Sequence, residues 1–161
     1  MRGTNARPAP PEKPLLLSDP RVPAVQVRDC GEPLTALGES FGPCRALVRV
    51  SVARRLAQAR DALPPGVRLR VVDCSGRELD LGTPVDTTPE QSEGACYFGA
   101  PGVARRARAN RELLARVLRG AGLVNYPTEW WHWSYGDRYW ALVTGAQAAL
   151  YGPVAADRVA R

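Results

Sequence analysis

A glutamate and a histidine three residues apart are the residues best suited to chemistry in this chain. Glu129 and His132 occur in the string Glu-Trp-Trp-His, and His132 is the only histidine among the 161 residues. An imidazole and a carboxylate at this spacing suit a catalytic zinc site in which the histidine is a ligand and the glutamate is the general base. Because a catalytic zinc normally has three protein ligands, the sequence predicts only part of such a site.

The backbone around this pair decides whether the two side chains can meet. In a regular strand Glu129 and His132 would point to opposite faces, because successive side chains alternate. They converge only if the chain bends at residues 127–129 or carries a β-bulge, a device found beside active sites. The simpler alternative is a tryptophan-rich core strand with His132 hydrogen-bonded and Glu129 at its rim. In the catalytic interpretation, a dry pocket wall is formed by Trp130, Trp131, Trp133 and Tyr135.

Two helices are predicted to flank a long loop. Apolar residues recur every three or four positions over residues 45–63, which predicts a helix that ends at Pro64-Pro65-Gly66. A second helix is predicted over residues 103–120, with an outward pair of Glu112 and Arg116. Between the helices, residues 82–102 are rich in Gly, Pro, Thr and Ser, which predicts a surface loop. The inward positions of the second helix are Ala107, Leu113, Leu114, Val117 and Leu118.

Short strands are predicted around the first helix. Apolar residues alternate with arginines over residues 67–71, which indicates a half-buried strand. A turn at Ser75-Gly76 followed by Leu79 and Leu81 indicates a partner strand. Short apolar pieces between turn residues over residues 15–43 predict irregular chain or edge strands.

The end of the chain predicts a cluster of strands. Residues 123–126, the Trp-rich run and residues 139–143 are all strand-like, and Gly136-Asp137 fits a hairpin turn between the last two. The order of helix, strand, loop, helix and clustered strands favours an α+β fold, with an antiparallel sheet and flanking helices.

Composition is that of one soluble globular domain. Hydrophobic residues make up 45% and charged residues 24% of the chain. The proline-rich residues 1–14 predict a disordered arm before a domain over residues 15–154, with residues 155–161 as a tail. No apolar run approaches the length of a bilayer span, and Leu15-Leu16-Leu17 is too short for a signal-peptide core. We therefore expect a cytoplasmic protein without a membrane partner.

Charge and cysteine content do not favour a nucleic-acid-binding protein or a domain stabilised by disulfides or structural zinc. The net charge is +6, but Lys13 is the only lysine and the arginines are scattered, which does not favour phosphate binding. No Cys-x-x-Cys pair occurs, so neither a disulfide framework nor a structural zinc site is expected. Free thiols are predicted at Cys30, Cys44, Cys74 and Cys96.

Residues 126–140, Tyr-Pro-Thr-Glu-Trp-Trp-His-Trp-Ser-Tyr-Gly-Asp-Arg-Tyr-Trp, resemble the C-terminal signature of the D-alanyl-D-alanine dipeptidases. These are zinc peptidases of the vancomycin-resistance type. The resemblance implies that Glu129 is the catalytic acid/base and His132 a zinc ligand, and that the substrate is a small D,D-dipeptide of peptidoglycan precursor metabolism. It also implies the fold of the zinc D-Ala-D-Ala peptidases. Further blocks that agree with the family are residues 16–22, 63–67, 76–84 and 149–154.

The same resemblance implies an internal deletion after Asp73. Family members continue with a Gly-Tyr-Arg-Pro turn, whose arginine is thought to stabilise the transition state. A helix and a Ser-x-His-x-x-Gly-x-Ala-x-Asp segment follow, and this segment supplies the other two zinc ligands. Here Asp73 leads directly into residues 74–77, Cys-Ser-Gly-Arg. Weak or absent zinc binding, an unpaired sheet edge and exposed apolar surface are therefore expected.

Several alternatives remain open at the level of sequence. Asp73, Cys74, Asp80 or Asp86 could replace the missing ligands, or they could be turn residues and a buried thiol. The chain could also be a non-catalytic remnant that binds a peptide or muramyl-peptide fragment at the aromatic wall. A basic nucleic-acid binder is the third class, and its affinity would fall steeply with salt.

Overall fold

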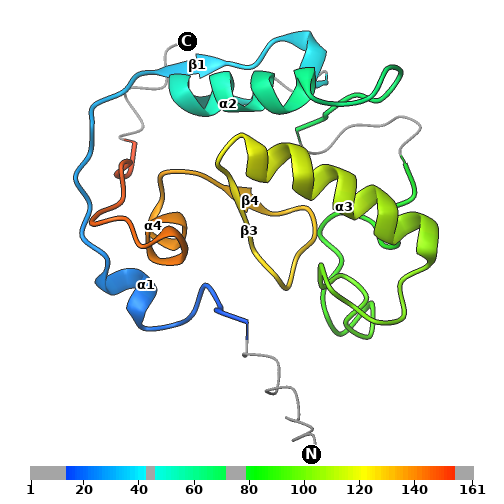
Figure 1. The fold of residues 1–161 in the computed structure, drawn as a ribbon. Helices are drawn as coiled ribbons and strands as arrows, with labels where there is room; N and C mark the ends of the chain where they lie inside the picture. The colour runs from blue at the N-terminus through cyan, green and yellow to red at the C-terminus, as the bar shows by residue number, and fades with distance from the viewer. Residues whose placement is uncertain (1–13, 43–45, 72–78, 155–161) are drawn as a thin grey trace, which may run out of the picture.

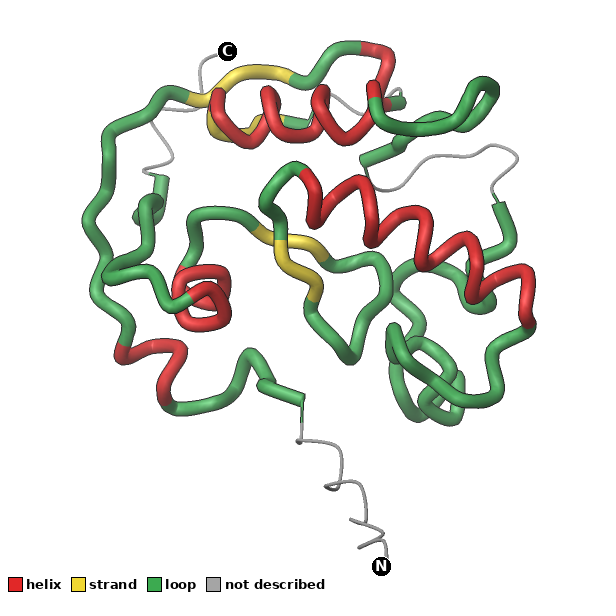
Figure 2. The backbone as a smooth tube through the Cα atoms, in the orientation of Figure 1, coloured by secondary structure: helices red, strands yellow, loops and turns green. Residues whose placement is uncertain are grey.

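The computed structural model describes residues 14–42, 46–71 and 79–154. Figures 1 and 2 show β3 and β4 between α3 and α4, with α2 and β1 together at the opposite edge from the N-terminus. The described residues form an α+β fold whose strands pair in two separate two-stranded antiparallel sheets. The elements are α1 (Arg21–Ala24), β1 (Leu34–Ala36), the 3-10 helix η1 (Glu39–Phe41), β2 (Leu47–Arg49), α2 (Val50–Asp61), α3 (Arg105–Gly120), β3 (Val124–Asn125), β4 (Trp133–Ser134) and α4 (Arg138–Thr144).

The first predicted helix begins later than its apolar spacing indicates. Residues 47–49 form β2, which pairs antiparallel with β1, so that Leu34 lies opposite Arg49. The helix α2 therefore starts at Val50, and the prediction of helix over residues 45–49 is wrong where the structure describes it. The reason is that β1 takes up the backbone hydrogen bonds of this segment, a partner that helical periodicity does not reveal. The predicted end before Pro64 is confirmed, because α2 closes at Asp61.

The main hydrophobic core lies where α2 and α3 contact each other. Leu56 and Ala59 of α2 face Val117 and Leu118 of α3, and Ala59 is completely buried. Burial of each large apolar side chain stabilises the fold by about 1.5–3 kcal/mol. The buried members of this core are Leu37, Phe41, Leu56, Ala59, Leu69, Val117, Leu118, Ala121 and Leu123.

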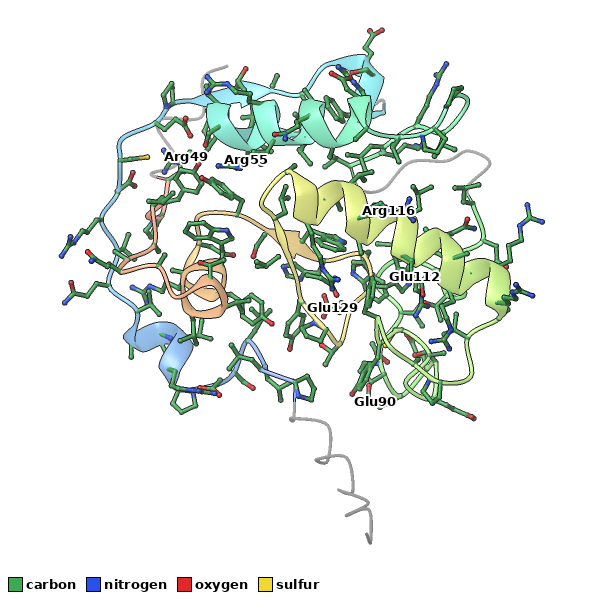
Figure 3. All side chains as sticks on the ribbon, in the orientation of Figure 1. Arg49, Arg55, Glu90, Glu112, Arg116 and Glu129 are labelled. Atoms are coloured by element: carbon green, nitrogen blue, oxygen red, sulfur yellow. The ribbon has the colours of Figure 1, made fainter. Side chains whose placement is uncertain are left out.

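The second helix is confirmed as α3, and its inward face is the predicted one. Ala107, Val117 and Leu118 are buried, whereas the other two predicted inward residues, both leucines, are partly buried against the core. The predicted ion pair between Glu112 and Arg116 is wrong, since the ion pairs of the described residues do not include it. Figure 3 labels both of these side chains on α3. Both are exposed to solvent, where an i,i+4 ion pair adds little stability.

The strand predicted over residues 67–71 is not present. Leu69 is buried in the core, but this stretch joins no ladder; Val71 N–H instead donates a single bond to Phe41 O at 3.0 Å. Leu79 and Leu81, which were predicted to lie in its partner strand, are irregular chain, and Ser75-Gly76 lies outside the described residues. The alternation of apolar residues and arginines over residues 67–71 thus reflects a stretch with one side against the core, and not a strand in a sheet.

The loop predicted over residues 82–102 is confirmed, because the structure places no helix or strand in it. It runs beside the N-terminal half of α3 (Figure 1). Three side chains of α3 bind its backbone carbonyls and those just before it: Arg108, Asn110 and Arg111. These bonds satisfy polar groups that no strand partner satisfies.

The strand predicted over residues 139–143 is wrong, because these residues belong to the helix α4. Asp137 is not part of a hairpin turn; its Oδ1 accepts the Trp140 N–H at 2.6 Å and so caps the first turn of α4. Gly145 ends the helix in the left-handed conformation, with φ +70°. These two local signals determine the helix against the strand preference of its aromatic residues.

The N-terminal segment is joined to the C-terminal segment. Val27 forms a parallel bridge with Ala149, flanked by hydrogen bonds from Arg28 N–H to Ala149 O and from Cys30 N–H to Leu150 O. Irregular chain or edge strands were predicted over residues 15–43, where the structure has β1 and also the short helix α1. The disordered arm over residues 1–14 and the tail over residues 155–161 lie, apart from Pro14, outside the described residues.

Candidate functional site

Two linked turns between β3 and β4 carry the predicted pair. Glu129 N–H donates to Tyr126 O at 3.0 Å, and His132 N–H donates to Glu129 O at 3.2 Å. Tyr126 N–H returns to His132 O at 2.9 Å and closes the connection. The backbone therefore bends through residues 126–132, which is one of the two conditions under which Glu129 and His132 could meet.

This bend brings the two side chains together. Glu129 Oε2 lies 3.0 Å from His132 Nδ1, and their side chains are 34% and 41% exposed. The Asn125 amide donates to the carbonyls of both residues at 3.0 Å and fixes the backbone beneath them. The prediction of a regular core strand is wrong at this place, since only Trp133 and Ser134 of the run are strand. Glu129 is labelled in Figure 3, in the connection that leaves β3.

Two tyrosines support the imidazole from one side. The Tyr126 ring stands edge-on to His132, with centroids 5.7 Å apart, and edge-on to Tyr139 at 5.5 Å. Burial raises the pKa of Tyr139 to about 12, and neighbouring Tyr126 and Asp137 add to the shift. The Tyr139 hydroxyl donates to Leu15 O at 3.2 Å. The pair is thus backed by packed aromatic rings.

Three of the four predicted wall residues surround one apolar cavity. Trp130 is 4% exposed, and its indole donates to Thr83 Oγ1 at 2.9 Å. Trp131 stands edge-on to Trp130, and the Trp133 indole donates to Trp130 O at 3.0 Å. The cavity has a volume of about 290 Å³, and neither Glu129 nor His132 lines it. Besides the three tryptophans its lining residues are Leu56, Leu69, Arg70, Val71, Leu79, Leu81, Val85, Leu114, Leu118 and Leu123.

The fourth predicted wall residue, Tyr135, is not among the residues lining this cavity. Arg55 lies over its ring, with Cζ 3.8 Å from the centroid, and donates to its hydroxyl at 2.7 Å. The Tyr135 ring also contacts two aromatic rings, with its centroid 4.8 Å from that of Trp140 and 6.2 Å from that of Tyr151. Tyr135 thus ties α2 to the C-terminal segment in this structure.

The described residues do not fit a complete zinc site. A catalytic zinc takes three protein ligands, and residues 14–42, 46–71 and 79–154 contain no group of three histidine, cysteine or acidic side chains placed to hold a metal. Of the suggested substitute ligands, Asp80 accepts the Gly82 N–H at 2.9 Å as a turn residue, and Asp86 takes a positive φ of 61°. Asp73 and Cys74 lie outside the described residues.

The cysteines follow the sequence prediction as far as they are described. Cys30 is an exposed free thiol, and Cys96 is a buried one. Cys44 and Cys74 fall outside the described residues. Cys96 lies in the loop over residues 82–102, and its backbone carbonyl accepts the Trp130 N–H at 3.1 Å. Cys96 therefore supports the segment that carries the pair through its backbone carbonyl and not through its thiol.

Arg111 is the residue near the site that sequence reasoning missed. Its side chain is only 1% exposed, although it is charged. Burial lowers the pKa of Arg111 from its ordinary value, and Arg108 lowers it further, whereas Cys96 and Asp80 act in the opposite direction. A signal was present in the sequence, because Arg111 lies four residues after Ala107 and seven before Leu118, which places it on the predicted inward stripe.

Comparison with known proteins identifies the family in which this pair occurs. A family model described as D-ala-D-ala dipeptidase matches residues 45–147, more than half of the chain, including α2, α3 and the turns that hold Glu129 and His132. The chain therefore belongs to the D-Ala-D-Ala dipeptidase family, which confirms the resemblance found in the sequence.

A curated relative agrees with this membership. The D-alanyl-D-alanine dipeptidase of Synechocystis sp. is 31% identical over 80 residues, which cover 45% of this chain and 32% of that protein. The chain thus matches only about a third of the length of this relative. No solved structure matches the chain.

Proposed function

We propose that residues 126–132 carry one part of a dipeptidase site, with Glu129 as the acid/base and His132 as a zinc ligand. The reaction that these residues suit is zinc-assisted hydrolysis of a small D,D-dipeptide related to peptidoglycan precursors. The support comes from the family membership and from the name of the Synechocystis relative. The described residues alone do not complete a zinc site, so we expect this chain by itself to be a poor catalyst.

The contact between Glu129 Oε2 and His132 Nδ1 at 3.0 Å is the observation that carries this proposal. A carboxylate that accepts a hydrogen bond from Nδ1–H fixes the neutral imidazole in the tautomer whose Nε2 lone pair is available. Metal-binding histidines are commonly oriented in this way. Among the described residues, His132 Nε2 and Glu129 Oε1 have no hydrogen-bond partner, so one nitrogen can bind a ligand and one oxygen can take a proton from water.

The experiment measures zinc content and turnover of the purified full chain. We expect less than one zinc per chain after equilibrium dialysis against zinc, because the described residues contain no group of three side chains placed to hold a metal. Hydrolysis of D-Ala-D-Ala, followed by release of free D-alanine, should be no faster than that of the Glu129→Ala variant. A His132→Ala variant should remove the residual zinc.

The opposite result is equally clear. One zinc per chain, together with turnover that disappears in Glu129→Ala while the circular dichroism spectrum is unchanged, would show a complete enzyme. The second and third protein ligands would then have to come from residues outside the described ranges or from a second chain.

A second function, peptide binding without catalysis, is supported by the cavity of about 290 Å³ that the three tryptophans line. Ligand sites in proteins are typically apolar and of about this size or larger. Calorimetry with D-Ala-D-Ala in excess chelator separates the two functions. A binder keeps its affinity without metal and loses it in Trp131→Ala, whereas the catalytic proposal expects no binding in chelator.

The same proposal gives the protein a small-molecule partner in the cytoplasm and no nucleic-acid role. Among the described residues, no helix is long and apolar enough to cross a bilayer. Of the scattered arginines, Arg55 and Arg111 are engaged with tyrosine, tryptophan and backbone carbonyls in the fold. Binding to nucleic acid with a steep salt dependence would contradict this assignment.

A further inference from the structure

Arg111 joins two separate parts of the irregular chain beside α3. Its Nε donates to Leu81 O at 2.7 Å, its Nη1 to Tyr97 O at 2.7 Å and its Nη2 to Ala95 O at 2.9 Å. Within the described residues it forms no ion pair with a carboxylate. A guanidinium presents its N–H donors in a fixed planar arrangement, so these three bonds determine where both segments lie relative to the helix.

Both of the segments that Arg111 holds also hold Trp130. Thr83 Oγ1, two residues after Leu81, accepts the indole N–H of Trp130 at 2.9 Å. Cys96 O, in the other segment, accepts the backbone N–H of Trp130 at 3.1 Å. The Arg111 Cζ atom itself lies 5.8 Å from the centroid of the Trp130 ring. Trp130 is therefore fixed by its ring and by its backbone, each through a segment bound to the same guanidinium.

A further bond reaches the other side of Glu129. Phe98 N–H donates to Pro127 O at 2.9 Å. Pro127 precedes Glu129 by two residues, and Trp130 follows it directly. The backbone that carries Glu129 is thus held on both sides by the segment over residues 95–98, which Arg111 anchors.

Gly82 shows how closely the chain approaches the guanidinium. Its φ is +91°, and a Cβ at this position would lie 3.1 Å from Arg111 Nη2 and 3.1 Å from a methyl group of Val103. A side chain here would have to displace one of these groups. A glycine at position 82 therefore allows the positive φ and leaves room for the Arg111 guanidinium to reach its carbonyl partners.

We propose that Arg111 is a positioning residue for the Glu129–His132 pair, acting through the segments at residues 81–83 and 95–98 that hold Trp130 and Pro127. Arg111 touches neither member of the pair, and it is not a catalytic residue. The inference rests on the proposed function, because positioning of Glu129 and His132 affects activity only if the two residues belong to a dipeptidase site. The geometry that it explains does not depend on bound metal.

The single histidine gives a direct test, because His132 supplies the only imidazole signals of the protein. The nitrogen chemical shifts of its ring are measured by NMR in the metal-free full chain at mildly alkaline pH, with Glu129→Ala as the reference for a broken pair. In Arg111→Met we expect these shifts to move at least halfway from the wild-type values to those of Glu129→Ala. Arg111→Lys keeps the charge but not the fork of donors, so it should move them part of the way.

Two controls separate positioning from general loss of stability. Arg106→Gln removes a charge from an exposed position of α3, and Phe41→Leu weakens the core at η1; both should leave the His132 shifts unchanged. If Arg111→Met does not fold, the His132 shifts of Arg111→Lys and Gly82→Ala test the proposal instead. In Gly82→Ala the added Cβ should push the loop away from the guanidinium of Arg111. Wild-type His132 shifts in every folded variant of Arg111 and Gly82 would overturn the proposal. Failure of the zinc proposal appears instead in metal content and turnover, which this experiment does not use.

Discussion

Two stretches of irregular chain lie on either side of residues 72–78, and they are stabilised in different ways. The loop over residues 82–102 has its carbonyls bound by side chains of α3, with Arg108 donating to Ala100 O and Pro101 O at 3.0 and 3.1 Å. The stretch over residues 67–71 contributes buried or half-buried side chains to an apolar cavity of about 290 Å³. Except at Val85, which also lines the cavity, the loop is therefore held by polar bonds, whereas the other stretch packs its side chains along the cavity.

The comparison shows what irregular chain requires in order to be well packed. Backbone carbonyls away from water need donors, and a neighbouring helix can supply them with arginine and asparagine side chains. Apolar side chains need atoms to pack against, and a cavity loses these contacts without gaining hydrogen bonds. Leu79, which is 43% exposed, also lines this cavity.

The largest effect should come from enlarging a side chain on the tightly bound side. Ala107 is completely buried, and its Cβ lies 3.4 Å from where a Cβ on Gly82 would be. Ala107→Leu should lower the free energy of unfolding by about 2–3 kcal/mol, because the added atoms have no space. Urea denaturation of this variant and of the exposed control Ala109→Leu measures the difference. Equal stability of the two variants would mean that this side is not closely packed.

An enlarged side chain on the cavity side should have the opposite sign. Val85 belongs to the loop over residues 82–102 but lines the cavity, and Val85→Leu adds one methylene group that can fill part of it. We expect the free energy of unfolding to rise by about 0.5–1 kcal/mol, as for other cavity-filling changes. Thermal unfolding checks this, with Val143→Leu, at a position 46% exposed, as the matched control. A loss of stability in Val85→Leu would show that the cavity is already occupied in solution.

An effect at neutral pH no larger than that of Val85→Leu should come from a polar bond that joins neither stretch. Tyr139→Phe removes the bond to Leu15 O and should cost about 0.5–1 kcal/mol. The fold raises the pKa of this phenol to about 12 from an ordinary value of 10.0, so the neutral form is favoured in the folded state. This contribution is complete below pH 10 and is lost as the pH rises from about 10 toward 12.

The measurement for Tyr139→Phe is urea denaturation across this alkaline range. The wild type should lose more stability than the variant, because the phenylalanine has no proton to release. Tyr151, whose pKa burial also raises to about 12, gives the remaining loss in both proteins. Parallel curves for wild type and variant would contradict the assignment of Tyr139.

Glu129 and His132 were singled out by their residue types and spacing, and the structure places their side chains together. The residues that support the pair were not predicted. Arg111 lay on the inward stripe of α3, but a buried arginine is rare, and its partners are backbone carbonyls whose positions the sequence does not show. Tyr135 was predicted to form the wall together with the three tryptophans, yet it does not line the cavity, and Arg55 lies over its ring.

The fold was predictable where the signals are local. The helix α3 and the loop before it followed from a long apolar period and from a run of turn residues. The start of α2 was misjudged because the pairing of β2 with β1 depends on residues that are distant from the helix pattern. The helix α4 was missed because its aromatic residues favour strands, although the Asp137 cap and Gly145 were readable signs of a helix.

The parallel bridge between Val27 and Ala149 has a consequence for how the chain reaches this structure. The nearby bond from Gly152 N–H to the Asp29 carboxylate joins residues that are 123 positions apart. Contacts of such separation carry a large loop-closure entropy, so they form late unless the intervening chain is already ordered. We therefore expect the pairing of these two segments to follow the assembly of α2 on α3, and its closure to be a slow step in folding.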